Sequence, residues 1–406
     1  MKKKKDIVYD YVIVGGGIIG LSIAYKLSLK DEQSSILVLE KEKDLALHQT
    51  GRNSGVIHSG IYYKPNSFKL KNCIEGRRQL VDFAKVNNIS FEMCGKLIVA
   101  TKEKELPVLN KIYENGLRNG LSLIKLLNEK QSKFYEPEVK CLKSIFVPYA
   151  GIINYVGVVK KMEELLNAKN NYNKVIKSNK IIKIKDTDTY KELYTKDLSF
   201  KGKYVIFACG LQADEMAILD GIDLKSRIIG FRGDYYNVVK SGKSKVKSLI
   251  YPVPNIDLPF LGVHLTKMYD SSVEAGPNAV LSFKKEGYSK TSFSFEDTFK
   301  MVFYIGFWKL IKTYWKLGLK EYARAFSKTA FLNSLRVLVP NLKKEDLITG
   351  KIGVRAQALD VNGNLIDDFL IKKTKNSLHV INAPSPAATA SLAIADEVLN
   401  RIKENE

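Results

Sequence analysis

Apolar residues in the first forty positions follow two different spacings. Residues 9–14 (YDYVIV) and 35–39 (SILVL) are short, nearly continuous apolar runs, which are typical of strands buried in a parallel sheet. Residues 21–27 (LSIAYKL) instead repeat their apolar positions with the period of a helix. The glycine-rich run 15–20 (GGGIIG) joins the first strand to this helix. The pattern predicts a β-α-β unit at the start of the chain.

Further along the chain, helical and strand patterns alternate, without an internal repeat or a low-complexity linker. Helical spacing predicts helices at residues 70–85, 103–119, 156–167 and 385–402. Alternating or apolar runs predict strands within residues 91–100, 172–200, 204–208, 227–238, 249–265 and 351–370. The sequence therefore indicates a mixed α/β protein.

The glycine run has the spacing G-x-G-x-x-G of dinucleotide-binding sites. Gly15 permits a tight turn, Gly17 lets the backbone approach a pyrophosphate, and Gly20 lets the helix pack closely on the strand. Glu40 ends the second strand, where a carboxylate can accept hydrogen bonds from ribose hydroxyls. A glycine turn without a ligand is the alternative. Strand, helix, second strand and acid all stand in the required order, so we expect a dinucleotide site.

The choice between FAD and NAD does not depend on Glu40, because a carboxylate binds ribose in both cases. The motif lies at the very start of a long chain, and residues 204–210 (YVIFACG) form a second strand-glycine signal. Ala208 and Gly210 in this run are small enough for the backbone to pass close to a cofactor. We therefore expect FAD.

Cofactor-type segments occur near residues 10–60, 200–210 and 350–400, so the cofactor domain is expected to be discontinuous. The predicted division gives the FAD-binding domain residues 6–90, 146–216 and 349–403. It gives an inserted substrate domain residues 91–145 and 217–348.

Composition narrows the class of protein further. The formal net charge is +22, which suits an acidic small molecule or an anionic membrane surface, although bias of the source genome explains it as well. No nucleic-acid-binding motif accompanies the charge, and no nucleic acid is expected. The four cysteines form no C-x-x-C pair, which favours a reducing compartment over a disulfide framework or a metal site. No apolar run is long enough to span a bilayer, so a cytoplasmic protein, peripheral on the membrane's inner face at most, is expected.

Ten sequence blocks in chain order carry a resemblance to a known family. They read GGGIIG, HQTGRNSGVIHSGIYYKP, CGKLIVA, GIINY, FRGDYY, YPVPN, PFLGVH, GPNAVLSFKKEGY, GVRAQALD and NAPSPAATASLAIADEV. Together they resemble the FAD-dependent L-2-hydroxyglutarate dehydrogenases (oxidases) of the D-amino-acid oxidase-like superfamily. The blocks cover nearly the whole chain, and HQTGxNSGVIHSG and NAPSPAA are the most specific of them.

The resemblance implies a two-domain α/β (α+β) fold, in which a mixed β-sheet substrate domain is inserted into a Rossmann-like FAD-binding domain. It also implies oxidation of L-2-hydroxyglutarate to 2-oxoglutarate, with electrons passing to a quinone-linked acceptor or to oxygen. A related FAD enzyme that oxidises glycine, sarcosine or glycerol 3-phosphate remains an alternative. A non-enzymatic flavoprotein scaffold that recruits RNA or lipid is a further one.

Oxidation of a hydroxy acid needs a base for the hydroxyl proton, and histidine is the usual choice. His264, at the end of a predicted strand in the substrate domain, is the first candidate. His58 is the second, and it suits positioning of flavin or substrate as well. His48 is expected beside the flavin, where some relatives link a histidine to it covalently. His379 is expected to be structural.

A dicarboxylate substrate needs positive groups, and arginine binds carboxylates in a bidentate manner. Arg355 is the best candidate, because superfamily members commonly hold a substrate carboxylate with an arginine on a late strand. Arg232 either binds the second carboxylate or pairs with Asp234. Three further residues are expected in the substrate site, namely Tyr251, Asn278 and Lys284.

The irregular run 48–63 is expected to lead the chain from the adenosine end of FAD toward its reactive ring. The last helix is expected to begin near Pro386, so that its N-terminus faces the flavin. The remaining residues predicted to bind the cofactor are Lys41, Thr50, Asn53, Ser54, Gly55, Pro384, Ser385, Ala387, Ala388 and Thr389.

Residues 299–322 (FKMVFYIGFWKLIKTYWKLGLKEY) predict one basic and aromatic amphipathic helix. Its apolar face contains Phe303, Phe307, Leu310, Tyr314 and Leu317, and lysines lie opposite. Such a helix either lies on a membrane surface or packs its apolar face against the protein core.

Overall fold

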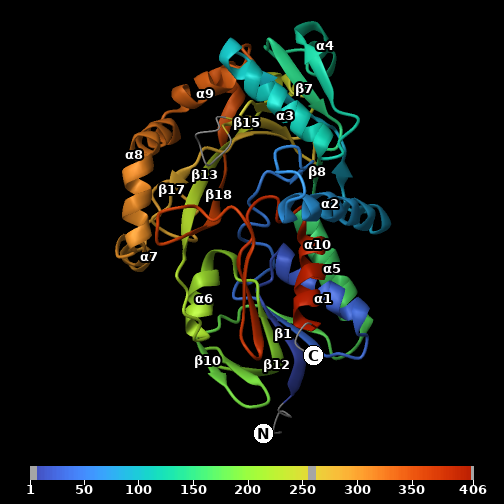
Figure 1. The fold of residues 1–406 in the computed structure, drawn as a ribbon, viewed down its shortest axis with the longest axis vertical. Coiled ribbons are helices and arrows are strands. Elements are labelled where there is room, and N and C mark those ends of the chain that lie inside the picture. The colour runs from blue at the N-terminus through green and yellow to red at the C-terminus, as the bar shows by residue number, and fades with distance from the viewer. Residues whose placement is uncertain (1–6, 255–261, 404–406) are drawn as a thin grey trace.

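The structure is a computed structural model that describes residues 7–254 and 262–403. The molecule is elongated, with one large β-sheet toward each end, and both termini lie near the end that holds β1 (Figure 1). The chain thus has two parts, each built around one of these sheets.

The sheet at the terminal end is centred on β1 (Val8–Val14). This strand runs parallel to β2 (Ile36–Leu39) on one side and to β12 (Ser199–Phe207) on the other. The other five strands are β9 (Lys174–Ile176), β10 (Lys183–Asp186), β11 (Lys191–Tyr194), β19 (Leu370–Lys373) and β20 (Ser377–Asn382). The predicted β-α-β unit is confirmed.

Helices cover both faces of this sheet, which explains why its central strands are apolar at nearly every position. On one face, α1 (Ile18–Lys30) packs against α5 (Tyr155–Lys169) and α10 (Ser391–Lys403), and α2 (Phe68–Val86) packs against α10. On the other side, α6 (Ala213–Leu219) contacts β12 and β20.

The second large sheet, of nine strands in the described residues, lies at the opposite end of the molecule (Figure 1). Its strands are β5 (Lys96–Ala100), β6 (Lys125–Asn128), β7 (Lys143–Val147), β13 (Arg227–Val238), β14 (Leu249–Pro252), β15 (His264–Lys267), β16 (Val273–Gly276), β17 (Val280–Leu281) and β18 (Leu347–Leu359). The longest pair is β13 with β18, which run antiparallel.

Several helices flank this sheet, and three short strands from separate parts of the chain form a third, small sheet. The helices are α3 (Leu106–Arg118), α4 (Glu129–Tyr135), α7 (Phe295–Val302), α8 (Ile305–Phe326) and α9 (Lys328–Arg336). The small sheet consists of β3 (Val56–Ile57), β4 (Phe91–Glu92) and β8 (Gly151–Ile153). No helix in the described residues is long and apolar enough to cross a membrane.

The exact domain boundaries remain a prediction, and β18 bears on one of them. The predicted boundary at residue 349 falls inside this strand, which pairs with β13 along its length. Strands of the terminal-end sheet resume only at β19.

Two helix predictions were wrong in part, one at its start and one in its interior. The last helix begins at Ser391 rather than near residue 385, because residues 385–390 form turns, in which the Ala390 N–H donates to the Pro386 carbonyl oxygen at 2.9 Å. The predicted helix 299–322 is broken between α7 and α8, where Tyr304 has extended backbone angles. The Tyr304 hydroxyl donates to the Leu359 carbonyl oxygen at 3.0 Å, which ties the break to β18. Within the predicted strand region 249–265, residues 255–261 lie outside the described residues.

Candidate active site

A cavity of about 1140 Å³ is lined by residues from both large sheets. This volume exceeds the range of about 300–1,000 Å³ that is typical of pockets for drug-sized ligands. The glycine motif and Glu40 lie at one end of the lining, and residues of β13, β14, β15 and β18 contribute the other. A long ligand can therefore reach from the first sheet to the second.

The glycine motif has the geometry that its spacing predicts. Gly15 has a φ of +118°, which side chains other than glycine rarely adopt, and a Cβ there would lie 2.4 Å from the Ala208 carbonyl oxygen. A Cβ on Gly20 would lie 2.0 Å from the Gly15 carbonyl oxygen. Gly17 lines the cavity, so the backbone beside the N-terminus of α1 is open to a ligand.

Glu40 is held in place at the end of β2. Its carboxylate accepts hydrogen bonds from the backbone N–H groups of Gly16, at 2.7 Å, and Glu42, at 2.9 Å. The side chain is buried yet lines the cavity. An ionised carboxylate fixed in this way can accept further hydrogen bonds from ribose hydroxyls.

The irregular run 48–63 is fixed by its own short polar side chains. The Thr50 hydroxyl accepts a hydrogen bond from the Ile18 N–H at 3.0 Å, which caps the start of α1. Asn53 donates to the Thr50 carbonyl oxygen at 2.8 Å and accepts from the Gly55 N–H at 2.7 Å. The Ser54 hydroxyl lies 3.1 Å from that of Tyr235 in β13, so the run also contacts the second sheet.

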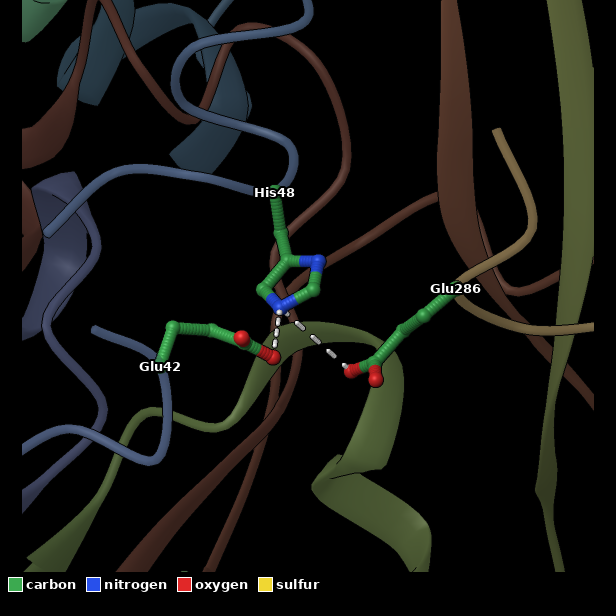
Figure 2. A group of neighbouring side chains, drawn as sticks. All are labelled: Glu42, His48 and Glu286. Atoms are coloured by element: carbon green, nitrogen blue, oxygen red, sulfur yellow. Dashed lines mark hydrogen bonds and ion pairs between the residues drawn. The ribbon is translucent and has the colours of Figure 1, made fainter. Parts of the chain in front are cut away.

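His48 belongs to a charged cluster at the cavity wall, together with Glu42 and Glu286 (Figure 2). Its Nε2 lies 3.0 Å from a Glu42 carboxylate oxygen and 3.8 Å from one of Glu286, and its Nδ1 contacts the Tyr288 hydroxyl. Lys41 pairs with both carboxylates, at 2.8 Å and 2.6 Å. Its ammonium already balances the charge that a metal ion would otherwise balance, so the cluster is an ion-pair network between two loops.

The second end of the cavity contains the residues expected to carry the chemistry. His264, Tyr251 and Arg355 line it from β15, β14 and β18, and His58 lines it from the irregular run. The rings of Tyr251 and His264 stack, with centroids 3.8 Å apart. His379 lies elsewhere, in β20, with its Nε2 2.8 Å from Asp220, as expected for a structural histidine.

His264 has one ring nitrogen engaged and one without a partner. Nδ1 lies 2.9 Å from the Gly262 carbonyl oxygen, and Nε2 is buried with no hydrogen-bond partner among the described residues. A carbonyl oxygen can only accept, so the proton is on Nδ1 and the lone pair of the neutral ring is on Nε2. Burial, with the positive charges of Arg355 and Lys96, lowers the pKa of His264 to about 3.

Several predicted site residues do not line the cavity. Arg232 is buried and donates to Asp234 at 2.9 Å, and Asn278 donates to the same carboxylate at 3.2 Å. Lys284 also lies outside the described lining. None of these three residues lines the cavity, and of the two alternatives for Arg232 the pairing with Asp234 is the one present; their substrate-binding role stays an untested prediction.

The predicted cofactor residues divide in the same way. Those that line the cavity are Gly15, Gly17, Glu40, Lys41, His48, Thr50, Asn53, Ser54, Ala208, Gly210, Pro384, Ser385, Ala387 and Ala388. Gly20, Gly55 and Thr389 lie behind them. Thr389 is buried, and its hydroxyl oxygen accepts a hydrogen bond from the His58 N–H at 3.1 Å. The dipole of α10 begins beyond the segment 384–388, so this segment meets the cavity as turns rather than as a helix N-terminus.

Two cavity residues and one neighbour escaped the sequence-based prediction. Tyr62 and Tyr235 line the cavity beside the histidines. Lys96, in β5, is buried directly behind Tyr62 and Tyr251. The signal that could have revealed Lys96 is a lysine at the head of the wholly apolar run LIVA.

The fold and the dinucleotide end of the cavity define a flavin-dependent oxidoreductase, and residues 10–401 match the family described as FAD dependent oxidoreductase. The chain is 44% identical to an L-2-hydroxyglutarate dehydrogenase of Indibacter alkaliphilus, covering 96% of this chain and 98% of that protein. It is 41% identical to the mitochondrial enzyme of that name from Homo sapiens, covering 97% and 89%. The chain belongs to the FAD dependent oxidoreductase family, in the group that these L-2-hydroxyglutarate dehydrogenases form.

Solved structures agree with the fold. A dithionite-reduced L-alpha-glycerophosphate oxidase from Mycoplasma pneumoniae with FAD bound has a TM-score of 0.79 at 24% identity, covering 98% of this chain and 95% of that one. A glycine oxidase from Geobacillus kaustophilus has a TM-score of 0.74 at 14% identity, covering 98% and 95%. The predicted fold class is confirmed. FAD is the cofactor of this family, and the open backbone at Gly17, the fixed carboxylate of Glu40 and the length of the cavity all fit it.

Proposed function

We propose that this chain oxidises L-2-hydroxyglutarate to 2-oxoglutarate with FAD as its cofactor. The observation that carries the proposal is the meeting of His264 and Arg355 in one cavity with the dinucleotide site. The identity of 38–44% to curated L-2-hydroxyglutarate dehydrogenases over nearly the whole chain supports the same substrate. When bound, FAD supplies the acceptor for the hydride that leaves the carbon bearing the hydroxyl.

His264 takes the hydroxyl proton at Nε2. The bond from Nδ1 to the Gly262 carbonyl oxygen fixes both the tautomer and the orientation of the ring. The low pKa of His264 keeps the imidazole neutral at pH 7 and therefore able to accept a proton. A substrate carboxylate close to the ring opposes the positive charges around it and makes Nε2 more basic.

Arg355 binds the carboxylate next to the reacting carbon. It lies in β18 opposite Phe231 of β13, a pairing that fixes its backbone within the sheet. A guanidinium presents two parallel N–H groups to a carboxylate, which fixes the orientation of the acid as well as its position. The Tyr235 hydroxyl interacts with both Ser54 and Arg355, so it links the guanidinium to the irregular run.

In this scheme His58 holds two segments of the cavity wall in position and does not exchange a proton. Burial, with the charges of Lys96 and other neighbours, lowers the pKa of His58 to about 3. Its Nε2 lies 3.4 Å from the Ser385 hydroxyl, so the ring joins the irregular run to the segment before α10. Both of these segments line the cavity.

The test is reduction of the bound flavin by candidate substrates without oxygen. Protein loaded with FAD is mixed anaerobically with L-2-hydroxyglutarate, and the loss of the visible absorbance of oxidised flavin is followed. Rapid bleaching by the L but not the D enantiomer is the expected result. Bleaching by glycine, sarcosine or glycerol 3-phosphate instead would overturn the proposal and assign the chain to a related activity.

We propose that the electron acceptor is quinone-linked or is oxygen. We also propose that the protein binds peripherally to the cytoplasmic face of a membrane. An exposed aromatic surface on α7, on α8 and at Phe303 between them supports membrane contact, since Phe299, Phe303, Trp308 and Trp315 are 62%, 73%, 56% and 49% exposed. Lysines of α8 lie among these rings, which suits the boundary of an anionic bilayer. Phe307 and Leu310 of the predicted apolar face are instead buried against β13 and β18 residues.

A further inference from the structure

Lys96 is a buried lysine that has no carboxylate partner among the described residues. Its side chain in β5 is 2% exposed, and no hydrogen bond or ion pair of the described residues joins it to an acidic group. Its Nζ lies 4.7 Å from the centre of the Tyr62 ring and 4.9 Å from that of Tyr251. Two ring faces recover only part of what an ammonium loses on leaving water. Burial accordingly lowers the pKa of Lys96 to about 8.

Other buried lysines in this chain are paired, which sets Lys96 apart. Lys191 and Lys285 are also buried, and each lies 2.7–2.8 Å from an aspartate oxygen. Lys69, which lines the cavity near Tyr63, lies 2.7 Å from Asp367. An unpaired buried charge is costly to a fold and is therefore a candidate for function.

The groups around Lys96 are positive or neutral, and two of them have unused hydrogen-bonding capacity. Tyr62 and Tyr251, which flank the ammonium, line the cavity together with His58 and His264. The Tyr62 hydroxyl and the His264 Nε2 are buried without hydrogen-bond partners among the described residues. Arg355 lies close enough to His264 to affect its pKa, as Lys96 does. This end of the cavity combines positive charge with one unused donor, the Tyr62 hydroxyl, so it is suited to an anion.

We propose that Lys96 is a specificity-determining residue that selects substrates with a second carboxylate. Its ammonium supplies the positive charge behind the cavity wall, and the Tyr62 hydroxyl in front of it donates the hydrogen bond. Arg355 binds the carboxylate next to the reacting carbon, and Lys96 acts on the distal one. This inference rests on the proposed function for the identity of the substrate. It gives Lys96 the role considered above for Arg232, whose guanidinium pairs with Asp234.

The experiment compares two acids of the same length with FAD-loaded protein. Glutarate has the second carboxylate and pentanoate lacks it, and the dissociation constant of each is measured from the change in flavin absorbance. Lys96→Met keeps a side chain of similar length without the charge. It should weaken glutarate binding by about 10- to 100-fold, because it removes the Coulomb attraction of a positive charge that lies behind Tyr62 in a weakly polar site. Pentanoate has no second carboxylate for Lys96 to attract. Its binding should therefore change by less than about threefold, the scatter expected for a substitution that does not act on the ligand.

Kinetics give a second readout and separate this inference from the proposed function. With L-2-hydroxyglutarate, Lys96→Met should raise KM far more than it lowers kcat, and Lys96→Arg should restore part of the loss. Lys191→Met, at a buried lysine remote from the cavity, should lower the melting temperature without changing the ratio of glutarate to pentanoate affinity. Equal losses for both acids in Lys96→Met would overturn the inference. Failure of the unchanged protein to oxidise L-2-hydroxyglutarate would overturn only the proposed function, since the preference for glutarate is measured without turnover.

Discussion

The Nδ1 atom of His264 lies 2.9 Å from the carbonyl oxygen of Gly262, and this contact decides which nitrogen of the ring can accept a proton. The Nε2 atom is left with its lone pair at the cavity.

His264→Gln should lower kcat by about 100- to 10,000-fold, the usual contribution of a positioned general base. Glutamine keeps a polar side chain there but accepts no proton, so glutarate binding should change little. The measurement is the rate of anaerobic flavin reduction at saturating L-2-hydroxyglutarate. A rate within a few-fold of the unchanged protein would assign the base elsewhere, and His58→Gln would then be the variant to examine.

Arg355→Met and Arg232→Met should separate a substrate-binding arginine from a structural one. Arg355→Met should raise KM strongly, because it removes the fork that binds the first carboxylate. Arg232→Met should destabilise the protein by about 3–5 kcal/mol, because it leaves the buried Asp234 carboxylate without its guanidinium. KM of the Arg232 variant should stay nearly unchanged at temperatures where it is folded. Denaturant unfolding and steady-state kinetics on both variants give the comparison, and the reverse pattern would contradict it.

Gly20→Ala should destabilise the protein by about 1–3 kcal/mol or more and weaken FAD binding, because its Cβ would meet the Gly15 carbonyl oxygen at 2.0 Å. Gly318→Ala is the matched control. Apart from its chain neighbours and the backbone of its own helix, no atom of the described residues lies within 4 Å of a Cβ built there, and the residue is inside α8. It should stabilise the protein by about 0.5–1 kcal/mol through helix propensity. Thermal unfolding with and without added FAD measures both, and equal effects would refute the packing argument.

Binding of glutarate should weaken as the pH rises through about 8, because Lys96 then loses the proton that gives it its charge. The other titratable groups around it are Cys73, His58, His264, Tyr62, Tyr251 and Arg355. Burial lowers the pKa of both histidines to about 3, raises that of the thiol to about 12 and raises the pKa of both tyrosines. None of these changes charge near pH 8, and an arginine keeps its charge throughout. The pH dependence should therefore disappear in Lys96→Met, and its persistence there would assign it to another group.

Trp308 and Trp315 should report contact with a membrane. If α8 lies on the bilayer surface, the protein should co-sediment with vesicles that contain anionic lipid and not with purely zwitterionic ones. Replacing both tryptophans by alanine should reduce the bound fraction without affecting flavin reduction, since neither residue lines the cavity. Equal recovery of the two proteins with anionic vesicles would count against this surface.

The parts of the fold that were predictable from sequence are those that local chemistry specifies. The order of strand, glycine turn, helix and acid around Gly15 and Glu40 is a local requirement, and it was confirmed. The start of the last helix was not predicted correctly, because Pro386 is as compatible with a turn as with a first helical turn. The sequence left Arg232 between a substrate carboxylate and Asp234, because the support that Asn278 gives to Asp234 comes from a distant part of the chain. The run LIVA after Lys96 marks a buried strand, but Lys96 was missed because only tertiary packing decides whether the lysine at its head has an acidic partner.

The cluster of His48, Glu42 and Glu286 has a consequence for loss of the cofactor. Glu42 and His48 belong to the loop beyond β2, whereas Glu286 belongs to the loop beyond β17, so the two loops share one set of charges. Moving either loop away from the other separates the Glu286 carboxylate from Lys41 and His48, so these charges hold the two loops together at this wall. Salt screens such partly exposed ion pairs, so a high salt concentration should loosen this wall and speed the release of a bound dinucleotide.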